Sequence, residues 1–104
     1  MRLKYGSVRT YSALCNREFD SKAECIRGEE LRLLEMAGEI SDLQYQIPFV
    51  LSKRPRVSIT VDFGYKGKEG KQIYEDVKGM GETREFRVKR IWLKQLRGID
   101  IILT

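Results

Sequence analysis

Two stretches of alternating apolar and polar residues lie in the middle of the chain, at residues 57–63 and 72–78. Alternation with a period of two is typical of half-buried strands, and the glycine-rich, charged turn between these stretches predicts a β-hairpin. Residues two apart on a strand share a face, so each stretch has one apolar and one polar side. The apolar side of the first stretch consists of Val57, Ile59, Val61 and Phe63, and its polar side of Ser58, Thr60 and Asp62.

The polar side of this hairpin carries three charged residues that we expect to converge. In the second stretch Asp76 and Lys78 share one face, whereas Glu75 points to the other. Same-face side chains on adjacent antiparallel strands lie roughly 5 Å apart, which brings Asp62 within reach of Asp76. The pattern therefore predicts a patch of Asp62, Asp76 and Lys78. The alternative is that these charges are simply solvated on one strand face.

A helix is predicted over residues 21–37. Ser21 and Glu24 fit a capping box at its start, and Gly38 is a typical residue just after a helix end. Gly28 leaves room for close approach by another element. Apolar residues recur at helical spacing and are expected to form the buried stripe. They are Ala23, Ile26, Leu33, Leu34 and Ala37.

Three further elements are predicted. Alternation indicates a strand over 43–51, which Pro48 places at an edge or a bulge. A second helix over 84–97 begins after Thr83 and ends at Gly98, and the nearly all-apolar residues 99–103 suggest an inner strand. The broad apolar face of the second helix is expected to lie on the sheet. It consists of Phe86, Val88, Ile91, Trp92, Leu93 and Leu96.

The order helix, three strands, helix, strand predicts an α/β fold of the α+β kind, with a four-stranded mixed sheet flanked by helices. The 104 residues are enough for one domain, and a hydrophobic content of 41% favours a folded globule. Residues 1–18 are basic and weakly patterned. They are either a partly mobile arm or an arm that contacts nucleic acid or a partner subunit.

The net charge and the composition of the chain limit the classes of function that it can have. A net charge of +5 favours a polyanionic partner. The chain has no histidine, which excludes Ser-His and Cys-His nucleophile pairs, and Cys15 and Cys25 alone make neither a zinc site nor a disulfide scaffold. No apolar run approaches the ~20 residues that span a bilayer. We expect no membrane association and a cytoplasmic protein with reduced thiols.

Two carboxylates and a lysine are the components of a metal-dependent phosphodiesterase. Magnesium prefers hard oxygen ligands, so Asp62 and Asp76 are candidate ligands, together with the backbone carbonyl of Val77. Lys78 could stabilise charge on the phosphoryl oxygens. Glu24 is the helix carboxylate best placed to complete the site, unless its role is only that of the capping box.

These residues resemble a known family. Asp62 followed by Asp76 and Lys78, with Glu24 on the preceding helix, is similar to the PD-(D/E)XK nuclease superfamily, whose core has the same order of elements. Val61 stands where the superfamily's name has proline, and Asp76 where many relatives have glutamate. A more extensive resemblance is to the phage endonuclease family described as Holliday-junction-resolvase-like. It rests on Lys4-Tyr5-Gly6, Phe19-Asp20-Ser21-Lys22, Ala37-Gly38-Glu39-Ile40, Leu43-Gln44, Asp62-Phe63 and Glu75-Asp76-Val77-Lys78-Gly79.

The resemblance implies a restriction-endonuclease-like core over residues 19–104 and a Mg²⁺- or Mn²⁺-dependent endodeoxyribonuclease that cuts branched DNA, such as a four-way junction, as a homodimer. It maps Glu24, Asp62 and Asp76 onto metal ligands and Lys78 onto the catalytic lysine. The basic face of the second helix would then contact phosphates, although it could also be an ordinary solvated face. Its candidate DNA-binding residues are Arg84, Arg87, Lys89, Arg90 and Lys94.

Two other functions remain open. One is a non-catalytic nucleic-acid-binding module on a nuclease fold, which would not need Asp62, Asp76 and Lys78 together. The other is a general small phage nuclease that acts on linear or nicked DNA.

Overall fold

The computed structural model describes residues 8–79 and 81–104 and contains one four-stranded sheet, one two-stranded sheet and two helices in this part of the chain. The four-stranded sheet has the order β3-β4-β5-β6, with antiparallel pairs except for the parallel pair β5–β6. The predicted α+β fold with a mixed four-stranded sheet is therefore confirmed. In chain order the elements are β1 (Thr10–Ser12), β2 (Arg17–Phe19), α1 (Lys22–Met36), β3 (Ile40–Lys53), β4 (Arg56–Gly67), β5 (Gln72–Asp76), α2 (Arg84–Arg97) and β6 (Ile101–Leu103).

The ends of both helices lie where local chemistry predicts them. Ser21 Oγ accepts a hydrogen bond from the Glu24 N–H, and Thr83 Oγ1 accepts one from the Phe86 N–H. Gly38 and Gly98 adopt the left-handed backbone conformation that ends a helix without a Cβ penalty. These caps explain why the predicted helix boundaries agree with the structure to within one residue.

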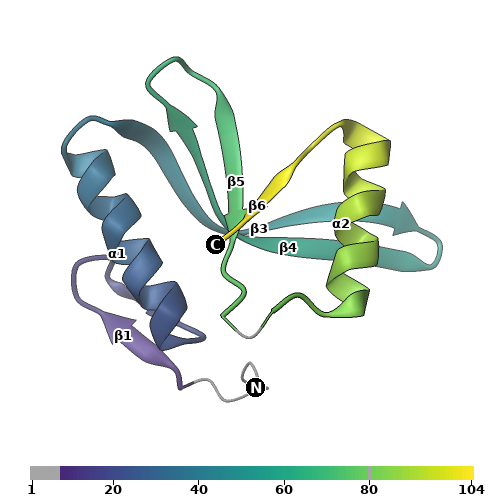
Figure 1. Cartoon of the computed structure of the whole chain (residues 1–104), viewed down its shortest axis with the longest axis horizontal. Coiled ribbons are helices and arrows are strands. Elements are labelled where there is room, and N and C mark those ends of the chain that lie inside the picture. The colour runs from purple at the N-terminus through teal and green to yellow at the C-terminus, as the bar shows by residue number, and fades with distance from the viewer. Residues whose placement is uncertain (1–7, 80) are drawn as a thin grey trace.

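A long hairpin of β3 and β4 connects the two sides of the molecule. Figure 1 shows this hairpin changing direction at the centre, with α1 beside one half and α2 beside the other. Each half has its own core. The core beside α1 contains Phe19, Cys25, Leu31, Phe63, Tyr65 and Val77, and the core beside α2 contains Phe49, Leu51, Ile59, Val61, Leu93 and Ile101.

The predicted buried stripe of α1 is wrong. Ile26 and Leu33 are each 54% exposed, and Ala23, Leu34 and Ala37 are exposed too. The helix instead buries the opposite side, where Gly28 lets the ring of Phe19 approach closely. An alanine Cβ at position 28 would lie 2.6 Å from Phe19 Cζ, so the predicted close approach is confirmed. The buried residues of α1 are Glu24, Cys25, Gly28 and Leu31.

Two expectations about the C-terminal part are also wrong. Only Leu93 of α2 is buried, whereas Val88, Ile91, Trp92 and Leu96 are exposed, so most of the predicted apolar face is not covered by the sheet. The last strand, β6, lies at the edge of the sheet and not inside it, and Ile102 is half exposed. The expected edge position of the strand around Pro48 is confirmed, since β3 is the other edge.

The N-terminal segment contains a small hairpin that the sequence did not predict. Strands β1 and β2 pair antiparallel and pack on α1, and Ser12 Oγ donates a 2.6 Å hydrogen bond to Glu29 Oε2. The first seven residues of the predicted arm lie outside the described residues.

Candidate metal centre

The carboxylates of Asp62 and Asp76 each accept a hydrogen bond from a backbone N–H at or next to the other residue. The Asp62 N–H donates a 3.0 Å hydrogen bond to Asp76 Oδ1, and the Val77 N–H donates a 2.9 Å hydrogen bond to Asp62 Oδ2. Both side chains are buried, with 5% and 2% of their surface exposed. The alternating pattern predicted that these two acids would meet, and the structure brings them together. They are more deeply buried than a solvated strand face would be.

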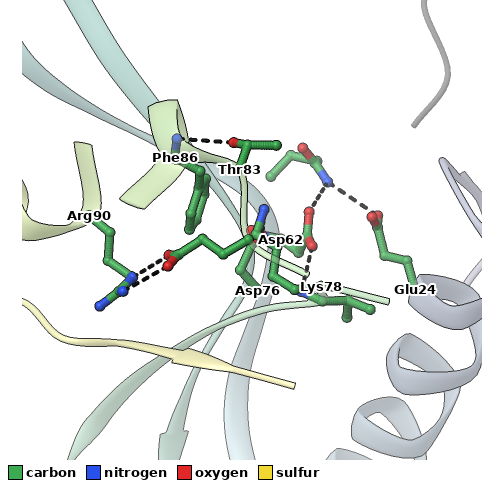
Figure 2. Close-up of polar contacts among 10 residues, drawn as sticks. Glu24, Asp62, Asp76, Lys78, Thr83, Phe86 and Arg90 are labelled. Carbon is green, nitrogen blue, oxygen red and sulfur yellow. Dashed lines mark hydrogen bonds and ion pairs between the residues drawn. The ribbon is translucent and has the colours of Figure 1, made fainter. Parts of the chain in front are cut away.

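Lys78 completes the predicted patch. Its Nζ lies 2.7 Å from Asp76 Oδ2 and 3.5 Å from the centre of the Phe86 ring. Figure 2 shows Lys78 beside Asp62 and Asp76, with Phe86 from the first turn of α2 facing the same point. A cation over an aromatic face is held electrostatically, so α2 helps to orient this ammonium. The helix cap at Thr83 places Phe86 there.

Glu24 reaches the same region from α1 and is 1% exposed. Its carboxylate is connected to Asp62 through a residue that sequence reasoning missed. Gln46 Nε2 donates hydrogen bonds of 3.3 Å to both Glu24 Oε2 and Asp62 Oδ1. In the sequence Gln46, like Gln44, is a polar residue that alternates with apolar ones, a pattern typical of an ordinary solvent-facing strand position.

The backbone at Gln46 explains how its side chain reaches both acids. The pairs Tyr45–Phe63 and Ile47–Val61 place Gln46 opposite Asp62 in the β3–β4 ladder. Gln46 has a φ of 53°, in the left-handed region, which costs a non-glycine residue about 1–2 kcal/mol. Strained backbone of this kind is concentrated at functional sites.

Electrostatics at the site favour a cation. Burial, and then the neighbouring Asp62 carboxylate, raise the pKa of Asp76 to about 6, while Lys78 opposes this shift. Two buried carboxylates side by side are costly unless positive charge compensates them. In the described part of the chain, no three acidic, histidine or cysteine side chains already form a metal-binding group. The available donors are nevertheless hard oxygens, which fit Mg²⁺ or Mn²⁺.

Glu75 faces the other side of β5, as the pleat predicted. Arg27 binds it through two hydrogen bonds, of 2.8 Å and 2.9 Å, and the hydroxyl of Tyr65 donates a third. Burial raises the pKa of Glu75, but these hydrogen bonds outweigh burial and hold the pKa below its usual value. Glu75 is therefore a structural anion that ties β5 to α1.

Most of the predicted DNA-binding residues already have acidic partners within the chain. Arg87 and Arg90 both bind Glu82, whose pKa falls to about 2, mainly because of the hydrogen bond from Arg90. Lys89 pairs with Glu85, and Lys94 with Asp100. Arg84 is exposed, and none of the ion pairs between described residues involves it.

A cleft of about 330 Å³ lies between β4 and the start of α2. Thr60, two residues before Asp62 on the same strand, lines it, as does Phe86, which contacts Lys78. The cleft therefore adjoins the carboxylate site. Its other lining residues are Ser58, Ile59, Thr83, Glu85 and Lys89.

The remaining composition-based expectations concern thiols and membranes. Cys15 and Cys25 are free cysteines, and burial raises the pKa of Cys25. Both lie in or against the core beside α1. Neither α1 nor α2 has the length and apolar character needed to cross a membrane, and these are the helices of the described residues.

A family model described as "Protein of unknown function (DUF1064)" matches residues 2–102. This match spans nearly the whole chain, so the chain belongs to that family. No curated protein and no solved structure matches the chain.

Proposed function

We propose that this member of the family is a metal-dependent endodeoxyribonuclease. The observation that carries the proposal is the pair of buried, mutually anchored carboxylates of Asp62 and Asp76, with the Lys78 ammonium 2.7 Å from Asp76. Burying two acids beside an amine costs stability, and strongly perturbed buried carboxylates of this kind cluster at binding and catalytic sites. The resemblance to the PD-(D/E)XK superfamily supports the same residues.

The cofactor in this proposal is Mg²⁺ or Mn²⁺, held by Asp62 and Asp76 with the carbonyl of Val77 and with Glu24. When bound, such an ion offsets the charge of a phosphodiester and lowers the pKa of a bound water. The chain's own residues supply orientation. Lys78, held by Asp76 and Phe86, offers N–H donors to the phosphoryl oxygens on which charge develops.

Branched DNA is the proposed substrate, and a homodimer in the cytoplasm of the cell is the proposed active form. The net charge of +5 supports a polyanionic partner. The cleft beside Asp62 supports entry of a DNA strand along β4, past Ser58 and Thr60. A four-way junction has two symmetric strands to cut, which requires two sites and hence two subunits.

One gel tests the reaction. The purified chain is incubated with Mg²⁺ or Mn²⁺ on a four-way junction, a flap and a linear duplex of matched sequence. We expect cleavage of the junction, and loss of cleavage with retained DNA binding for Asp62→Asn, Asp76→Asn and Lys78→Ala. Glu69→Gln is the control for the loss of an acidic charge, because Glu69 is exposed at the turn between β4 and β5, and it should keep its activity.

Other outcomes of these experiments would favour a different function or remove a residue from the proposed mechanism. Equal cleavage of all three substrates would indicate a general nuclease, and DNA binding without cleavage would indicate a non-catalytic binding module. Full turnover by any of the three substituted chains would remove that residue from the mechanism. Sedimentation of the chain with and without junction DNA would test the dimer.

A further inference from the structure

The side chain of Gln46 stands between two carboxylates that come from different elements. Its Nε2 lies 3.3 Å from Glu24 Oε2 on α1 and 3.3 Å from Asp62 Oδ1 on β4. Both acids are at least 95% buried. A group that donates to two carboxylates at once occupies the kind of position that a bridging cation takes. Gln46 is the residue through which α1 and the sheet share the site.

The backbone supports a functional role for this position. Gln46 has a φ of 53°, in the left-handed region that residues other than glycine, asparagine and aspartate seldom adopt. A glycine here would relieve the backbone strain, but it would remove the amide. Asp42, on the same strand, has a φ of 54° but is exposed, so left-handed backbone in β3 does not itself require contact with the site.

We propose that Gln46 changes roles when a divalent cation binds: it orders two carboxylates without the ion and serves as a further, neutral ligand with it. Without the ion its amide N–H₂ donates to Glu24 and Asp62 and holds these carboxylates together. With the ion the amide turns, and Oε1, a hard neutral oxygen, faces the cation beside the two carboxylates. The inference rests on the proposed metal site and adds a side chain to it.

Cation binding tests this role without any measurement of cleavage. Isothermal titration with Mn²⁺ alone is carried out on the full chain and on Gln46→Asn. Asparagine tolerates the left-handed backbone but is one methylene shorter and cannot reach both acids. We expect about 10- to 100-fold weaker Mn²⁺ binding, the loss typical of removing a group that orients metal ligands. Asp42→Asn is the matched control and should bind like the unsubstituted chain.

A second variant separates positioning from a merely structural role. Gln46→Glu replaces a donor by a third carboxylate, so its melting temperature in chelator should fall. Mn²⁺ should then raise that temperature by more than it does for the unsubstituted chain. If the role of Gln46 were purely structural, Gln46→Glu would lower the melting temperature equally with and without Mn²⁺.

The outcomes are distinguishable. If the unsubstituted chain binds no Mn²⁺, the proposed metal site and this inference both fail. If it binds Mn²⁺ and Gln46→Asn binds within twofold of it, the metal site stands and the role of Gln46 is overturned.

Discussion

The Asp62 N–H donates a 3.0 Å hydrogen bond to the carboxylate of Asp76, fourteen residues further along the chain. The Val77 N–H returns a 2.9 Å hydrogen bond to Asp62. Because both bonds join side chain to backbone across the β4–β5 pair, the sheet itself holds the two acids in place. The predictions below test the physical basis of this site and of the fold around it.

The pKa of Asp76 predicts a pH dependence of stability. Burial and the Asp62 charge raise this pKa from 3.8 to about 6, so the folded chain keeps the proton to a higher pH than the unfolded chain. The stabilising effect of the protonated form is fully present below pH 4 and is lost as the pH rises through about 6. The loss should reach about 3 kcal/mol.

Urea denaturation in chelator at pH 4, 5, 6 and 7 measures this loss. Asp76→Asn carries no titrating group, so its stability should fall less steeply with pH than that of the unsubstituted chain. The exposed Glu69→Gln serves as control and should retain the original slope. A slope unchanged in Asp76→Asn would contradict the assignment.

Glu75 is buried, and its ion-pair partner Arg27 is 28% exposed. Arg27→Ala leaves the buried Glu75 carboxylate uncompensated and should cost about 3–5 kcal/mol in the free energy of unfolding, whereas Glu75→Ala should cost less because Arg27 is partly exposed and also pairs with Glu30. Replacing both with methionine should cost less than Arg27→Ala. Urea denaturation of the three variants checks this, and additive losses would show that the pair is not coupled.

The contact between Gly28 and Phe19 predicts a steric cost. Gly28→Ala places a Cβ 2.6 Å from Phe19 Cζ in a core where Phe19 is 1% exposed. We expect a loss of about 1–3 kcal/mol, partly recovered by Phe19→Leu in the same chain. Gly79→Ala is the control, because no atom lies within 4 Å of the added Cβ. Equal melting temperatures for the two alanine variants would argue against the close contact.

Substitution by alanine at two leucines of α1 should lower the stability of the chain by very different amounts. Leu31 is fully buried, so Leu31→Ala should cost about 2–5 kcal/mol. Leu33 is 54% exposed, so Leu33→Ala should change stability by no more than about 0.5 kcal/mol. Thermal denaturation of a dilute sample compares them. A large loss for Leu33→Ala would indicate that another surface covers this face of the helix.

The arginines of α2 should differ in their contribution to DNA binding. Arg84 is exposed, whereas Arg90 is held by Glu82 through two hydrogen bonds. If Arg84 contacts a phosphate, Arg84→Ala should reduce the slope of log affinity against log salt by about 0.9, and Arg90→Ala should reduce it less. Fluorescence anisotropy with labelled duplex measures the slope. Lys71→Ala, a control with the same charge change at the β4–β5 turn, should leave it unchanged.

Local patterns in the sequence determined several features correctly. Alternation of apolar and polar residues placed the hairpin that carries Asp62 and Asp76, because a period of two is a direct property of strand geometry. Ser21, Thr83 and Gly98 marked the helix ends, because capping depends on groups within a few residues. The meeting of Asp62, Asp76 and Lys78 followed from this alternation and from the pairing of two strands adjacent in the sequence.

Only the tertiary structure decided which faces are covered. Both sides of α1 carry residues that could be buried, and the choice depended on the close approach that Gly28 allows to Phe19 and on the place of Glu24 beside Gln46. The left-handed turn at Gln46 has no local signature, since it is maintained by contacts with residues 16 and 22 positions away. Periodicity describes a single element, whereas burial depends on the partner that the rest of the chain brings to it.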